Sequence, residues 1–272
     1  MFRRAALRLS VGLSIACAGC GVEPAPEPRA EPQPPASVSV PVSVPRVDDR
    51  SPKAPHIIYL NREGARLSPG ADDASRNQSA IVRLAELERY DVPAFRGTPT
   101  QWNTMVSCLR EHFAPYRVEL VEQRPVQPGY LMAMMGGELG PLGAALQADR
   151  GNTIAGLAPF NGQAIESAVV LVFTRTLREN AKRMCETAAM EIAHAYGLDH
   201  AMHCGDLMSY LPACGTRRFQ DREVPCGQRE ERECGNGQPT QSSHRRLLDV
   251  LGPAQVDDEV DEDEVEKPIS EG

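Results

Sequence analysis

The sequence predicts a mixed α/β domain, in which a sheet is covered by two long helices and followed by a small disulfide-stapled C-terminal subdomain. Short β-rich apolar segments alternate with two stretches of helical periodicity, the pattern of a layered α/β fold. Four cysteines crowd between Cys204 and Cys234, where glycine and proline interrupt any helical or strand pattern. The 272 residues are enough for one sizeable domain with tails.

The first strand is expected in "PHIIYLNREG", whose β-rich core runs from Ile57 to Leu60 before turn residues begin. The following "SPGADDASRNQS" (68–79) is small and polar and is expected to be a loop. Further strands are expected in "YRVELVEQ", "GYLMAMMGG", "NTIAGLAPF" and "ESAVVLVFT". The last is almost wholly apolar, which favours a central position in the sheet.

The first long helix has clear start and stop signals. Thr98 can cap it, Pro99 suits the first helical position, Gln101 completes a capping box, and Pro115 ends it. One apolar face is formed by Trp102, Met105, Val106, Leu109 and Phe113.

The second long helix is expected to begin at Thr176, with Glu179 completing another capping box. Its apolar positions continue through Ile192 to Gly197, and this glycine permits the backbone conformation that ends a helix abruptly.

The N-terminus (1–20) resembles an export signal. Three arginines precede or flank the apolar run Leu9–Ala18, which is too short to span a bilayer. The run ends in "IACAGC", which resembles the lipobox of bacterial lipoproteins and implies lipidation of Cys20, with Cys17 as the alternative. The resemblance implies a periplasmic or outer-surface lipoprotein held on a membrane. "ACA" also resembles an ordinary cleavage site, which would release a secreted soluble protein.

The two ends of the chain are expected to lie outside the folded part. Residues 21–54 are rich in proline, which predicts an extended tether. Residues 254–272 are acidic and lack enough apolar surface to fold, which predicts a disordered tail. The net charge of −8 offers no broad basic surface for nucleic acid, so nucleic acid is not expected as a partner.

Removing Cys17 and Cys20 from the eight cysteines leaves six. In an exported protein an even set of six predicts three disulfides, although buried free thiols are the alternative. The sequence leaves the pairing open. The six are Cys108, Cys185, Cys204, Cys214, Cys226 and Cys234.

The segment "AAMEIAHAYGLDH" carries the candidate site. Position 190 and His194 are four residues apart and therefore share one face of the second helix. Glu191 stands where a carboxylate could take a proton from a metal-bound water. His200 follows the turn at Gly197 and can return toward the same point.

This spacing resembles the metzincin zinc peptidases, whose pattern is His-Glu-x-x-His-x-x-Gly-x-x-His followed by a turn with methionine. The resemblance implies that His194 and His200 are zinc ligands and Glu191 the catalytic base. It also implies that Met208, in "GDLMSY", forms the floor of the site and that Tyr210 stabilises the oxyanion. It divides the chain into a catalytic subdomain (55–203) and a Met-turn and Cys-rich subdomain (204–253).

The departure from the family is Met190, which occupies the first zinc-ligand position. A thioether is a poor zinc ligand and suits Cu(I) better, so Met190 with the two histidines could form a copper site. His203 and Cys204 are the candidates to replace the missing zinc ligand, although Cys204 is expected in a disulfide.

Three functions follow from this incomplete ligand set. The first is a degenerate zinc metallopeptidase with weak or absent peptide-bond hydrolysis. The alternatives are an active zinc endopeptidase that uses Glu191 as base, and a non-catalytic module that binds a peptide or protein. In all three the expected partner is a peptide or protein.

Overall fold

The computed structural model describes residues 54–146, 154–212 and 214–255. The predicted signal with Cys17 and Cys20, almost all of the tether and most of the acidic tail lie outside these residues. Within the described ranges, no helix combines the length and apolarity that a membrane crossing requires.

The central element is a five-stranded mixed sheet, which confirms the predicted fold class. In spatial order its strands are β5 (Val118–Val121), β1 (His56–Asn61), β6 (Leu131–Met135), β8 (Val169–Val172) and β7 (Gly156–Leu157). The first four run parallel, and β7 pairs antiparallel with β8 at one edge. The apolar segment that was expected to be central is β8, which pairs on both sides, although β6 holds the middle position.

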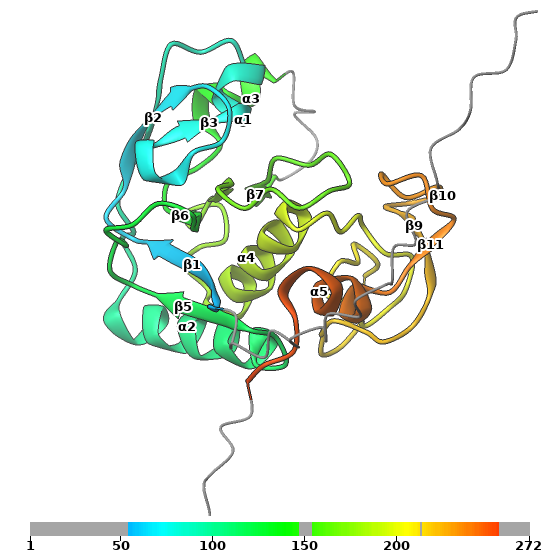
Figure 1. Cartoon of the computed structure of the whole chain (residues 1–272). Coiled ribbons are helices and arrows are strands. Elements are labelled where there is room, and N and C mark those ends of the chain that lie inside the picture. Colours follow the sequence, from blue (N-terminus) through cyan, green and yellow to red (C-terminus); the bar gives the residue numbers. More distant parts are fainter. Residues whose placement is uncertain (1–53, 147–153, 213, 256–272) are drawn as a thin grey trace, which may run out of the picture. The chain divides into compact units, whose positions relative to one another are not determined.

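Two long helices, α2 (Pro99–Phe113) and α4 (Ala181–Ala195), pack against each other and against one face of the sheet (Figure 1). The predicted capping box of α2 is confirmed. The Gln101 backbone N–H donates to Thr98 Oγ1 at 3.2 Å, and the Thr98 backbone N–H donates to Gln101 Oε1 at 2.7 Å. Both ends of this helix therefore follow the local signals in the sequence.

The predicted start of α4 at Thr176 is wrong. Arg178 and Glu179 have positive φ angles of 57° and 49°, which a right-handed helix cannot contain. The helix begins after Asn180, whose side-chain oxygen accepts from the Arg183 backbone N–H at 3.0 Å. A cap four residues later, at Asn180, therefore replaces the expected capping box, while the helix ends before Gly197 as predicted.

The opposite face of the sheet is covered by short elements. They are β2 (Ala65–Pro69), the 3-10 helix η1 (Ala74–Arg76), β3 (Gln78–Ser79), α1 (Ala80–Leu84), β4 (Tyr90–Val92) and α3 (Gly140–Ala145). Successive side chains of β1 point to opposite faces of the sheet. Ile58 and Leu60 lie in the hydrophobic core under α2 and α4, and Tyr59 lies in the second core, under the short elements. The segment 68–79 is thus not a plain loop. The segment contains part of β2, which pairs with β3, and η1, which Asp73 caps. Such short elements leave no periodic pattern of apolar residues in the sequence.

The C-terminal part contains β9 (Val224–Gly227), β10 (Glu231–Arg232), β11 (Thr240–Gln241) and α5 (Ser243–Leu251). In Figure 1, α4 lies between the sheet and these elements. The prediction of three disulfides is confirmed, and the pairs are Cys108–Cys185, Cys204–Cys214 and Cys226–Cys234. Such bonds belong to proteins that fold in an oxidising compartment, in agreement with the predicted export.

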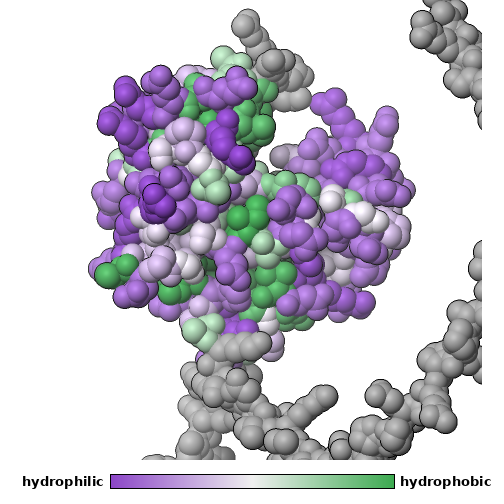
Figure 2. All heavy atoms as spheres, turned by 45° about the horizontal axis from the view of Figure 1, so that its top comes forward, coloured by the Kyte–Doolittle hydropathy of each residue, from purple (hydrophilic) through white to green (hydrophobic). Residues whose placement is uncertain are grey.

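The face shown in Figure 2 is largely hydrophilic, with hydrophobic residues gathered in several patches. Among the described residues, the exposed large hydrophobic side chains are those of Leu84, Val126, Phe160 and Tyr210. The last two line the same cleft, so exposed aromatic surface is concentrated there.

We expect Thr98→Ala to lower the free energy of unfolding by about 1 kcal/mol, because it removes the hydroxyl that caps α2. Thr100→Ala is the matched control, since Thr100 is exposed two residues further on and alanine favours the helix. Urea denaturation of both variants would measure the difference. Equal losses would show that the capping box contributes nothing.

Candidate functional site

A cleft of about 680 Å³ opens between α4, the edge strand β7 and the C-terminal part. Four of the predicted site residues line it together: Glu191, His194, His200 and Tyr210. The remaining lining comes from Ile154, Gly156, Leu157, Ala158, Phe160, Asp199, Gln228, Arg229 and Arg232. The spacing in the sequence therefore predicted a real convergence of side chains.

The two histidines lie against each other at the base of this cleft. Their ring centroids are 4.4 Å apart and the ring planes are nearly perpendicular, at 88°. His194 Nδ1 lies 2.6 Å from the Leu198 carbonyl, so Nδ1 carries the proton and Nε2 keeps its lone pair.

His200 has an unsatisfied ring nitrogen. Its Nδ1 is buried without a hydrogen bond, although the Met208 backbone carbonyl is close enough to favour the charged ring. Burial, followed by the neighbouring His194, lowers the pKa of His200 to about 3. Burial also lowers the pKa of His194. Both imidazoles are therefore neutral at neutral pH, the form that binds metals or accepts hydrogen bonds.

Glu191 is buried at the boundary between α4 and β7. A Cβ placed on Gly156 would lie 2.6 Å from both Glu191 Cγ and Oε1, so the carboxylate packs directly on the backbone of β7. Burial raises the pKa of Glu191 to about 8. Glycine at position 156 is what allows this close approach.

Two aromatic rings form walls of the cleft. The Tyr210 ring lies 4.4 Å from the His200 ring, and the Phe160 ring lies 5.7 Å from the His194 ring, measured between centroids. Burial, and then the charge of Glu191, raise the pKa of Tyr210 to about 12, so its hydroxyl keeps its proton. The cleft thus combines apolar walls with polar groups at its base.

The two methionines differ in position. Met190 is buried and lines a neighbouring hollow of about 180 Å³ instead of the cleft. This hollow shares Gly156, Glu191 and Tyr210 with the cleft, so the two adjoin each other. Met208 is fully buried in the core that packs α4, and its carbonyl accepts from the Ala201 backbone N–H at 3.0 Å.

No other predicted residue supplies a third metal ligand in the cleft. Cys204 is bonded to Cys214, and His203 is not among the residues that line the cleft. Asp199 lines it, but its oxygens accept from the Arg232 guanidinium at 2.5 and 2.7 Å. A catalytic zinc site takes three protein ligands, and the described residues provide two histidines. The cleft therefore does not fit a complete catalytic zinc site.

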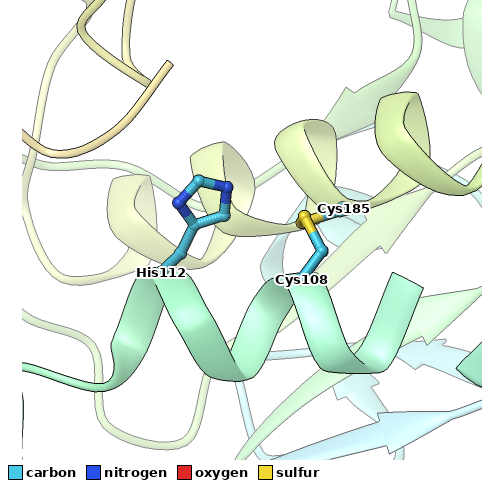
Figure 3. A group of neighbouring side chains, drawn as sticks. All are labelled: Cys108, His112 and Cys185. Atoms are coloured by element: carbon cyan, nitrogen blue, oxygen red, sulfur yellow. A yellow bond between two sulfur atoms is a disulfide. The ribbon is translucent and has the colours of Figure 1, made fainter. Parts of the chain in front are cut away.

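A different group of potential metal ligands lies between α2 and α4, where two of its three members are joined in a disulfide. Cys108, His112 and Cys185 are the one set of three or more His, Cys, Asp or Glu residues in the described part whose ligand atoms all lie within 4.8 Å of one another (Figure 3). The sequence signal that could have revealed it is the Cys-x-x-x-His spacing in the first long helix.

Comparison with known proteins adds no assignment. No model of a protein family matches the chain, and no curated protein matches it.

We expect Asp199→Ala to lower the free energy of unfolding by about 2 kcal/mol. The buried carboxylate accepts from Arg232 and from the backbone N–H groups of His200 and Gly235, and all of these bonds would be lost. Asp221→Ala is the control, because both partners of the Asp221–Arg245 pair are exposed and its loss should cost less than about 0.5 kcal/mol. Comparable losses in urea denaturation would contradict this ranking.

Proposed function

We propose that this chain is an exported peptide-binding domain with a metzincin-like cleft that hydrolyses peptide bonds weakly or not at all. One observation carries the proposal. Glu191, His194, His200 and Tyr210 converge on one cleft, whereas the first ligand position holds Met190, whose thioether is a poor zinc ligand.

The edge strand β7 supports a peptide as the ligand. It pairs with β8 on one side, and no strand of the described residues pairs with its other side. An exposed strand edge offers N–H and C=O groups to an extended peptide, which then adds to the sheet. Leu157 of β7 lines the cleft together with Phe160 and Tyr210, so apolar side chains of such a peptide would find apolar contacts.

The incomplete ligand set supports weak or absent hydrolysis. Sharing the binding free energy of a four-ligand zinc site equally gives about 3 kcal/mol per ligand, or on the order of a hundredfold in affinity. Two histidines also leave a zinc ion poorly fixed, and water activation depends on fixed coordination. A domain of this kind keeps the peptide-binding cleft and hydrolyses peptide bonds slowly or not at all.

An active zinc endopeptidase with Glu191 as base is the second candidate. The hydrogen bond from His194 Nδ1 to the Leu198 carbonyl favours it, because zinc-binding histidines commonly donate their other ring N–H in this way.

Zinc content separates the two candidates. We expect the purified wild-type domain to hold much less than one zinc per chain and to leave an unstructured protein uncleaved. Met190→His should gain zinc, because a histidine four residues before His194 can share its helix face. Leu84→His adds a histidine at an exposed position and is the control. Stoichiometric, chelator-sensitive zinc with cleavage in the wild type would establish the second candidate.

Peptide binding is tested separately at the aromatic walls. We expect Phe160→Ala or Tyr210→Ala to weaken binding of a fluorescent peptide library about fivefold, since an aromatic contact contributes about 1 kcal/mol. Val126→Ala removes an exposed side chain that does not line the cleft and should leave binding unchanged. Fluorescence anisotropy measures all three, and equal affinities would exclude the cleft as the binding site.

A further inference from the structure

We propose that Cys108, His112 and Cys185 bind one zinc ion when the Cys108–Cys185 disulfide is reduced. In this state the metal would take the place of the disulfide as the link between α2 and α4. The inference is independent of the proposed function, because none of the three residues lines the cleft.

The three ligand atoms are already gathered by the packing of the two helices. Cys108 and His112 are four residues apart in α2 and therefore project from the same face. Cys185 meets them from α4, with a Cα–Cα distance of 6.1 Å to Cys108. Figure 3 shows the His112 ring and the two sulfur-bearing side chains in the space between these helices. An imidazole nitrogen of His112 lies within 4.8 Å of both sulfurs, which are bonded to each other and would separate on reduction to bind one ion.

The donor types suit zinc. Thiolate sulfur and imidazole nitrogen are its usual protein ligands, at about 2.3 Å and 2.0–2.1 Å respectively. The His112 ring makes an edge contact with Phe219, at 6.4 Å between centroids, and no hydrogen bond to another described residue. Its nitrogens are therefore not committed elsewhere. Cys108 and His112 are partly exposed, so water can reach the fourth position.

The oxidation state of Cys108 and Cys185 determines whether they can bind a metal. In the disulfide, each sulfur is bonded to the other and is no thiolate. A dithiol reductant transfers two electrons and two protons to the S–S bond, which breaks to give two thiols, and the reductant becomes a disulfide. Binding of Zn²⁺ then displaces the two thiol protons to solvent. The oxidation state of the zinc ion does not change in this step.

The two helices would remain linked in both states. The Cys108–Cys185 bond closes a loop across a sequence separation of 77 residues, so its loss removes a constraint on the unfolded chain. A metal held by both helices would restore that constraint. Reduction would thus exchange a covalent link for a coordinate one.

The test uses the purified full chain with Co²⁺ as a spectroscopic substitute for zinc, under anaerobic conditions with a phosphine reductant. We expect no thiolate-to-cobalt charge-transfer band before reduction. After reduction we expect one equivalent of Co²⁺ to bind with this band and to be displaced by Zn²⁺. His112→Gln keeps the disulfide and should weaken binding by at least tenfold. His203→Gln is the matched control and should bind like wild type.

Three results would overturn the proposal. They are a reduced protein that unfolds or shows no band, an equal band in His112→Gln, and a band that persists in the Cys108→Ser, Cys185→Ser double variant. The last would assign the thiolates to Cys204, Cys214, Cys226 or Cys234, which reduction also frees. Metal bound before reduction without a sulfur band would report on the histidines of the cleft, and so bears on the proposed function alone.

Discussion

The site depends on the left-handed turn at Gly197, which ends α4 and reverses the chain. Its φ is 86°, a conformation that disfavours any side chain, and a Cβ there would lie 3.0 Å from the backbone of Gln163. The turn puts the Leu198 carbonyl against His194 Nδ1 and brings His200 to the same point, with the two rings 4.4 Å apart. One backbone conformation thus sets both the orientation of His194 and the position of His200.

Asp199 connects this turn to the C-terminal part. Its backbone N–H donates to Gln241 Oε1 at 2.9 Å, and its carboxylate accepts from the Gly235 backbone N–H and from the Arg232 guanidinium. Arg232 lies inside the small loop that the Cys226–Cys234 disulfide closes. A region with little regular structure is therefore fixed by a covalent bond and one buried carboxylate. This arrangement fixes Asp199 and Arg232, which line the cleft together with the histidines.

The sequence predicted those features of the fold that depend on residues close together in the chain. The capping box at Thr98 and the glycine at the end of α4 were predictable because each depends on neighbours in sequence. The start of α4 was not, because Thr176 and Glu179 have the same spacing as a capping box and the positive φ at Glu179 is set by the surrounding turn. The pairing of Cys108 with Cys185 is likewise a product of how two distant helices pack.

The same reasoning explains the partial success at the site. Glu191, His194 and His200 converge as their spacing predicts, because helix geometry and one turn are sufficient to bring them together. Met190, four residues before His194 in the same helix, lines the hollow that adjoins the cleft. Both long helices thus carry a sulfur residue four positions before a histidine. Of these two sulfur residues only Cys108 can become a thiolate, so the metal site proposed on α2 depends on the oxidation state of that sulfur.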